Sequence, residues 1–175
     1  MLIVLAAVNA LLIRQNLQMR ARLDQLKPKM LQPGDKVESF SAQGLHGEPI
    51  NMNYMGESKR VLLYFTPACP YCQEQFPYWQ EILRRANGNH FQVLGIVSET
   101  EDRTKVDEYL RSVGCESMRV AFVPNSLLKS YKLSMTPTTL VIATEGRVEN
   151  AWAGKWNSDF VADASSTFGF SFSQH

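Results

Sequence analysis

The first 30 residues carry an apolar run followed by an amphipathic segment. Residues 1–13 (MLIVLAAVNALLI) contain a single polar side chain, that of Asn9. A membrane-spanning helix needs roughly 20 apolar residues, so we interpret this run as part of an anchor whose true start lies upstream. Residues 14–30 interleave basic and apolar side chains, which is typical of an amphipathic helix. We therefore predict a truncated membrane anchor and an amphipathic stalk over residues 1–30.

Two other interpretations of the apolar run compete with the anchor. A buried helix of the globular domain is also apolar, and it remains the main alternative. A cleaved signal peptide fits less well, because no basic residues precede the run and no small-residue cleavage site follows it. Five basic residues follow the run, and by the positive-inside rule they favour a cytoplasmic location for that side. The orientation in the membrane therefore stays open.

From residue 33 onward, helical periodicity gives way to short apolar runs separated by turn residues. The strands are expected at residues 61–65, 91–97, 119–123, 138–143 and 148–153, and the helices at 70–86, 104–113 and 126–131. This alternation, closing on a hairpin, predicts an α/β domain over residues 33–156 with a central mixed sheet flanked by helices. Residues 157–175 begin helically and are predicted to form a C-terminal helix and tail.

Composition and charge narrow the function classes. The chain of 175 residues is 45% hydrophobic and 20% charged, which is enough for one compact domain. Its formal net charge of +1 gives no reason to expect nucleic acid as a partner. The three cysteines, Cys69, Cys72 and Cys115, exclude a disulfide-rich miniprotein and leave at least one thiol unpaired within the chain.

The close cysteine pair carries the strongest chemical signal. Cys69-Pro70-Tyr71-Cys72 is a C-x-x-C motif at the predicted junction of a strand and a helix. A thiol at a helix N-terminus has a lowered pKa, so Cys69 is the expected nucleophile. Cys72 is near enough to resolve a mixed disulfide on Cys69. A structural zinc site would need two further ligands, and the three histidines are widely scattered, so no metal is predicted.

A threonine and a proline before a late strand form the second candidate element. Thr136-Pro137 precedes the apolar run 138–143. The simple interpretation is a turn before an edge strand. The alternative is a cis proline that places the Thr136 backbone beside the two sulfur atoms, where an extended substrate can pair with it. Pro70 and Tyr71 are the further predicted substrate-binding residues. Cys115 is expected to be a spare buried thiol.

Taken together, these motifs resemble the thioredoxin fold and, within it, the membrane-anchored TlpA/ResA-like thiol-disulfide oxidoreductases. The resemblance covers about residues 33–156, and the segment 14–16 behind the apolar run is similar to the MauD-type branch. It rests on the motifs Pro33-Gly34-Asp35, Leu45-His46-Gly47-Glu48-Pro49-Ile50, Tyr64-Phe65-Thr66-Pro67-Ala68-Cys69-Pro70-Tyr71-Cys72, Phe76-Pro77 and Met135 to Leu140. It implies that Cys69 and Cys72 are the redox pair and that Pro137 is the cis proline.

Two positions depart from the family pattern. Gln75 stands where the family has a glutamate that handles protons, and Leu63 replaces the buried aspartate of many thioredoxins. An amide cannot accept a proton, and the adjacent Glu74 points about 100° away on a helix. We therefore expect slower proton transfer from Cys72 than in the family.

The resemblance implies a disulfide exchange enzyme that is a reductase or maturation factor. Its partners would be a protein dithiol or disulfide and an upstream electron donor, with no cofactor. Its redox domain would lie outside the cytoplasm, on the periplasmic side of a bacterial inner membrane. A peroxiredoxin-like thiol peroxidase is one alternative, because Thr66 and Cys69 also satisfy the T-x-x-C spacing of that family. A non-enzymatic, membrane-tethered assembly factor is the other.

Overall fold

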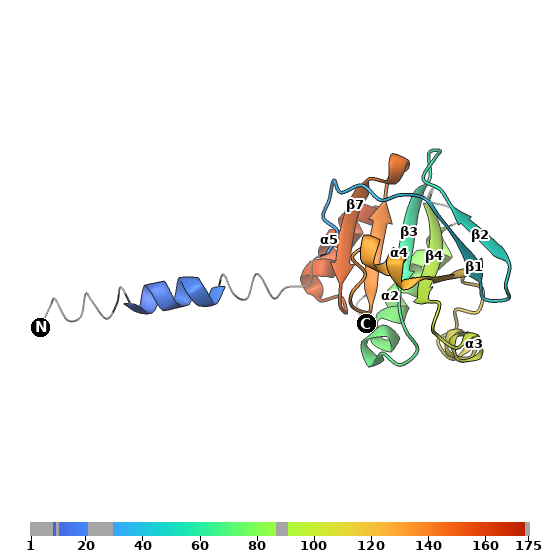
Figure 1. The fold of residues 1–175 in the computed structure, drawn as a ribbon, viewed down its shortest axis with the longest axis horizontal. Coiled ribbons are helices and arrows are strands. Elements are labelled where there is room, and N and C mark those ends of the chain that lie inside the picture. The colour runs from blue at the N-terminus through green and yellow to red at the C-terminus, as the bar shows by residue number, and fades with distance from the viewer. Residues whose placement is uncertain (1–8, 10, 21–29, 87–90, 174–175) are drawn as a thin grey trace, which may run out of the picture.

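A central mixed sheet organises the computed structural model, which describes residues 9, 11–20, 30–86 and 91–173 (Figure 1). The strand order is β2-β1-β5-β4-β3-β6-β7. The strands β3, β4 and β5 are parallel, and the remaining pairs are antiparallel. The strand bounds are β1 Phe40–Gly44, β2 Pro49–Met52, β3 Lys59–Tyr64, β4 Phe91–Ser98, β5 Val120–Val123, β6 Thr138–Ile142 and β7 Val148–Ala153. The sequence prediction of a mixed α/β domain is confirmed.

Helices cover both faces of the sheet. Side chains of α2, α3 and α5 pack in one core cluster, and Leu128 of α4 packs in the cluster on the opposite face. Alternate residues of β3 point to the two faces, with Leu63 in the first cluster and Leu62 in the second. The helices are α2 Pro70–Ala86, α3 Arg103–Ser112, α4 Asn125–Ser130 and α5 Ser158–Phe168, with a 3₁₀ turn η1 at Thr144–Gly146. A central strand buried on both faces explains why 61–65 is uniformly apolar.

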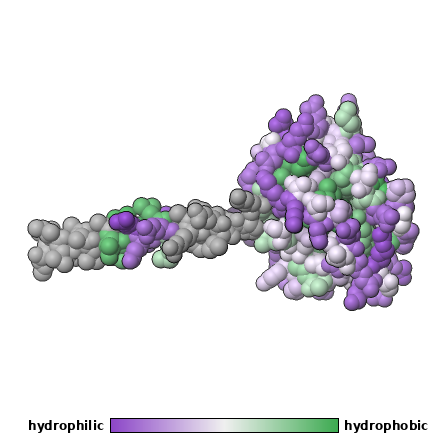
Figure 2. Space-filling view, viewed as in Figure 1, coloured by the Kyte–Doolittle hydropathy of each residue, from purple (hydrophilic) through white to green (hydrophobic). Residues whose placement is uncertain are grey.

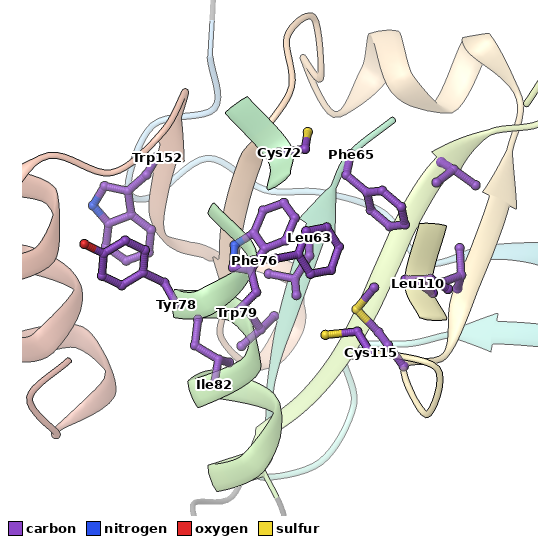
Figure 3. Packing of buried hydrophobic residues seen from close by; sticks show 14 of the residues in the cluster. Leu63, Phe65, Cys72, Phe76, Tyr78, Trp79, Ile82, Leu110, Cys115 and Trp152 are labelled. Atoms are coloured by element: carbon purple, nitrogen blue, oxygen red, sulfur yellow. The ribbon is translucent and has the colours of Figure 1, made fainter. Parts of the chain in front are cut away.

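A buried tryptophan of α2 links this helix to the sheet. Trp79 is fully buried, and its indole Nε1 donates a hydrogen bond to Thr139 Oγ1 at 2.8 Å. Its ring lies against Phe65 and Phe76 at the centre of the cluster (Figure 3). Because Thr139 belongs to β6, this contact ties the helix that follows Cys69 to the strand that follows Pro137.

The C-terminal segment packs into the same core as the sheet. The rings of Phe168 and Phe172 contact Trp152 and Trp156, and Phe172 is buried. The predicted C-terminal helix is present as α5, and it ends at Gly169 in a left-handed conformation. The residues after α5, for which the sequence indicated no structure, therefore add aromatic surface to the core.

The described part of the N-terminal segment is helical and exposed. Residues 11–20 form a helix, and every one of them is exposed. This argues against a buried helix of the globular domain for that part of the apolar run. Figure 2 shows hydrophobic side chains on the surface of this helix. Among the described residues, no helix has both the length and the apolar character needed to cross a bilayer. The rest of the predicted anchor and stalk, at 1–8, 10 and 21–29, lies outside those residues.

Candidate active site

The two cysteines of the C-x-x-C motif lie where β3 passes into α2. The helix begins at Pro70, so Cys69 directly precedes it and Cys72 lies in its first turn. The amide N–H of Cys69 donates to Thr66 O, and that of Cys72 donates to Cys69 O, each at 3.1 Å. Cys69 is partly exposed, Cys72 is fully buried, and both are free thiols. One sulfur is thus open to a partner, and the other is enclosed behind it.

The predicted cis proline lies directly beside this pair. The Thr136–Pro137 peptide bond is cis, and Cys69 Sγ donates to Thr136 O at 3.5 Å. The loop is held on its other side, because Gly154 N donates to Pro137 O at 2.7 Å. The structure therefore brings Cys69, Cys72, Thr136 and Pro137 together, as the sequence predicted.

Two large apolar side chains are exposed in these same segments. Tyr71, between the two cysteines, is 59% exposed, and Met135, next to Thr136, is 39% exposed. Tyr71 was a predicted substrate-binding residue, whereas Met135 was not. In the sequence, the only indication that Met135 belongs to the site was its position next to Thr136 and Pro137. Together they give the surface around Cys69 an apolar character.

The environment of Cys69 favours its thiolate. Partial burial opposes ionisation, but hydrogen bonds from the side chains of Thr136 and Cys72, and from the backbone of Cys72 and Tyr71, outweigh it and lower the Cys69 pKa below the usual thiol range. Backbone N–H groups at the start of a helix stabilise a negative charge in this way. Cys69 is therefore the better nucleophile of the two.

The environment of Cys72 has the opposite effect. Burial raises the pKa of Cys72 to about 12, although a backbone hydrogen bond with Thr66 partly offsets this. Figure 3 shows the Cys72 side chain near Phe65 at one end of the aromatic cluster. Apolar surroundings destabilise a thiolate, so Cys72 holds its proton at neutral pH. It can act as a nucleophile only when that proton is removed.

Gln75, which stands where the family has a glutamate, lies deep in the core. Gln75 is fully buried, and its Oε1 accepts a hydrogen bond from Trp156 N at 2.9 Å. Its Nε2 finds no hydrogen-bond partner among the described residues. The neighbouring Glu74 is exposed and forms an ion pair with Lys155 on the surface. Glu74 therefore does not share the buried position of Gln75, in agreement with the helical spacing.

A carboxylate that the sequence did not indicate lies near the motif. The Thr66 hydroxyl donates to Glu101 Oε1 at 2.6 Å. Thr66 follows β3 and Glu101 follows β4, and these parallel strands are neighbours in the sheet. The carboxyl ends of parallel strands meet at one edge of a sheet. Glu101 could not be placed near Thr66 from the sequence, because the sequence did not show that β3 and β4 are neighbours.

The third cysteine lies apart from the pair. Cys115 is buried, and burial raises its pKa to about 11. Figure 3 shows it near Leu110, at a distance from Cys72 across the cluster. This agrees with the expectation of a spare thiol. In the part of the chain that the structure describes, no cluster of His, Cys, Asp and Glu side chains is arranged to hold a metal ion.

Comparison with known proteins points to redox proteins. A model of the AhpC/TSA family matches residues 33–151. The thiol-disulfide oxidoreductase ResA of Bacillus subtilis is 22% identical over 130 residues, which are 74% of this chain and 72% of that protein. The sporulation thiol-disulfide oxidoreductase A of the same organism is 20% identical over 122 residues, 69% of this chain and 73% of that protein.

The fold has close counterparts among solved structures. A thiol:disulfide interchange protein of the thioredoxin family from Chlorobium tepidum superimposes with a TM-score of 0.63 and 18% identity, covering 80% of this chain and 99% of that one. The likeness identifies the fold as thioredoxin-like.

Proposed function

The chain belongs to the AhpC/TSA family and is a thiol-disulfide oxidoreductase, and we propose that it exchanges disulfides with protein partners through Cys69 and Cys72. One observation carries the proposal: two free thiols lie within one helical turn, one accessible with a lowered pKa and one buried with a raised pKa. That asymmetry gives one sulfur the role of attacking a partner and the other the role of releasing it.

The first step uses Cys69 and the Thr136 carbonyl. The Cys69 thiolate attacks one sulfur of the partner disulfide, forms a mixed disulfide and releases the other partner sulfur as a thiolate. In the resting state Thr136 O accepts from the Cys69 thiol. Once Cys69 is ionised or bonded to sulfur, that oxygen is free to accept an N–H from an extended partner backbone. The exposed Tyr71 and Met135 offer apolar contacts beside it.

The second step uses Cys72. It loses its proton and attacks Cys69 Sγ, so that a Cys69–Cys72 disulfide forms and the partner leaves as a thiol. Two electrons have then passed from the cysteine pair to the partner. An upstream dithiol donor must reduce the pair before the next cycle. In this direction the protein acts as a reductase or maturation factor. A non-enzymatic assembly factor, the alternative, would not pass through this cycle of oxidation and reduction of the cysteine pair.

A thiol peroxidase is the second candidate function. Thr66 lies three residues before Cys69, the spacing found in peroxiredoxins, and the AhpC/TSA match extends over this motif. The Thr66 hydroxyl, however, donates its hydrogen bond to Glu101 and not to Cys69. This supports disulfide exchange as the main activity.

Rapid mixing of the reduced protein with two oxidants distinguishes these functions. We expect a disulfide-bonded model protein to oxidise Cys69 and Cys72 at least about 10-fold faster than an equal concentration of hydrogen peroxide. The reason is that the cysteine pair can form a mixed disulfide at Cys69 and release the partner as a thiolate when Cys72 attacks. The readout is the loss of free thiols against time, and Cys69→Ser is the inactive control. A faster reaction with peroxide would make the peroxidase the main function.

The proposed location is the extracytoplasmic face of a membrane, with residues 1–30 as the tether. The apolar run supports it, and so do Leu11, Leu12 and Ile13, which are each more than half exposed in the described helix. We expect the full chain to sediment with membranes and to resist alkaline extraction, whereas a chain that starts at residue 31 stays in the supernatant. Equal behaviour of the two chains on fractionation would contradict the tether.

A further inference from the structure

A cavity of about 600 Å³ lies at the end of β3 and β4 opposite the cysteine pair. Its walls come from the starts of β3 and β4, the last turns of α2, the strand β2 and the connection that precedes β5. Cys69 follows the other end of β3. Figure 3 shows Cys115, one of the lining residues, away from Cys72 across the core cluster. Small-molecule sites occupy about 300 to 1,000 Å³, so the cavity is large enough for a ligand.

The cavity exists because β4 is longer than β5. The pairing of β4 with β3 begins at Phe91, whereas its pairing with β5 begins only at Gly95. Among the described strands, residues 91–94 therefore have a neighbour on one side only, and these residues line the cavity. The cavity thus follows from the lengths of the strands and not from the position of one side chain.

The charged side chains that line the cavity are all positive. Arg60 comes from β3, Arg84 from α2 and Arg119 from the connection before β5. None of the described residues that line the cavity is an aspartate or a glutamate. Uncharged amide and hydroxyl groups complete the polar lining, and they belong to Asn51, Asn53, Gln80, Gln92 and Ser117. A cleft lined by charges of one sign concentrates ions of the other sign, so the cavity favours an anionic occupant.

Arg60 is a buried charge that the described residues do not neutralise. It is 7% exposed, and its guanidinium donates to two backbone carbonyls, Ser58 O at 2.5 Å and Met55 O at 3.4 Å. The ion pairs of the described residues do not include Arg60. Burial of a charge without a partner of opposite sign is unfavourable. An anion in the cavity would supply that partner.

Gln92 and Arg119 extend the site from Arg60 toward the solvent. Arg60 and Gln92 are partners in the parallel pairing of β3 and β4, so their side chains point to the same face of the sheet. Gln92 and Arg119 are exposed, whereas Arg60 is buried. The cavity therefore has one cation at depth and a second cation at its rim.

Two carboxylates outside the cavity act on the other arginines. Glu81 forms an ion pair with Arg84 at 3.4 Å. The pKa of Glu48 is lowered mainly by a hydrogen bond with its own backbone, and the charge of Arg119 is a minor cause. Neither carboxylate forms an ion pair with Arg60 within the described part of the chain. The positive charge at the bottom of the cavity therefore remains available to a ligand.

We propose that this cavity binds a small organic molecule through a phosphate or carboxylate group, and that Arg60 and Arg119 hold the oxyanion. A guanidinium donates parallel hydrogen bonds to either kind of oxyanion. The volume leaves room beyond the oxyanion itself, and the amides of Asn51, Asn53 and Gln92 can bond to the rest of the molecule. The cavity does not include the cysteine pair, so this binding site is independent of the redox function.

Calorimetric titration of the whole chain with two probes, inorganic phosphate and citrate, tests the site. We expect saturable binding of at least one probe with a dissociation constant below about 1 mM, and no saturable binding of chloride at the same ionic strength. Tighter binding of phosphate would identify the ligand as a phosphate-bearing molecule, and tighter binding of citrate would identify it as a carboxylate.

Variants at exposed positions test the site without changing the core. Arg119→Gln should weaken the binding by about 10-fold or more, because it removes charge-assisted hydrogen bonds. Gln92→Glu places a carboxylate next to Arg60 and should abolish the binding. Lys105→Gln is the matched control, since it removes one positive charge from the exposed first turn of α3 and should leave the binding unchanged.

Three results would overturn the anion site. The first is the absence of saturable binding of either probe by the unmodified chain. The second is undiminished binding by Arg119→Gln and Gln92→Glu, which would place the anion elsewhere. The third is equal weakening in Lys105→Gln, which would reveal a general effect of net charge. Disulfide exchange is measured separately through the free thiols, so none of these results bears on the proposed function.

Discussion

Replacing Cys72 with serine is expected to abolish turnover and to leave the protein covalently joined to its partner through Cys69. The nucleophile remains accessible with its lowered pKa, so the mixed disulfide still forms. A serine hydroxyl cannot attack the Cys69 sulfur to release the partner, because it is a far weaker nucleophile than a thiolate. Adducts from membranes, separated without reducing agent and identified by mass spectrometry, give the readout.

Two controls establish which sulfur carries the adduct. Cys69→Ser should form none, and Cys115→Ala should behave like the unmodified protein because that thiol is buried apart from the pair. If Cys72→Ser captures no partner although Cys69 still reacts with small disulfides, the protein would act by docking alone. That result would favour a non-enzymatic assembly factor over disulfide exchange.

Alkylation of the folded, reduced protein at neutral pH is expected to modify Cys69 almost exclusively. Only the thiolate reacts, and a lowered pKa means that the Cys69 thiolate is already present at a pH where an ordinary thiol is protonated. With a pKa of about 12, Cys72 is ionised at pH 7 to only about one part in 10⁵. We therefore expect a rate difference of more than about 10³-fold.

The pH dependence checks the sign of both shifts. The rate at Cys69 should rise with pH and level off below the pH at which a free cysteine does, whereas modification of Cys72 should require strongly alkaline conditions. Peptide mapping with an iodoacetamide label gives both profiles. Cys115 is the internal reference for a buried thiol, since its pKa is raised to about 11. Similar labelling rates for Cys69 and Cys115 would refute the proposed activation.

Much of the fold could be predicted from the sequence, and the two strands that were not predicted were missed for the same reason. The apolar run 61–65 indicated a central strand, because such strands are buried on both faces, and 138–143 was predicted as a further strand. The strands Phe40–Gly44 and Pro49–Met52 were not predicted. They lie at one side of the sheet, and exposed positions alternate along them with buried or half-buried ones. The polar residues Ser41, Gln43 and Asn51 occupy exposed positions, so the two strands carry little apolar signal. β1 and β2 pair with each other, and they join the sheet through the pairing of β1 with β5, which is far away in the chain.

The sequence by itself determined the chemistry of the pair: the C-x-x-C spacing, its strand-to-helix junction and the Thr-Pro element are local features. What only the tertiary structure decided is which distant groups surround those sulfurs. It decided for a cis proline beside Cys69 over a simple turn, enclosed Cys72 and paired Glu74 with Lys155. It also brought Glu101 to Thr66. Burial and strand order arise from packing of the whole chain, so no local pattern of residues encodes them.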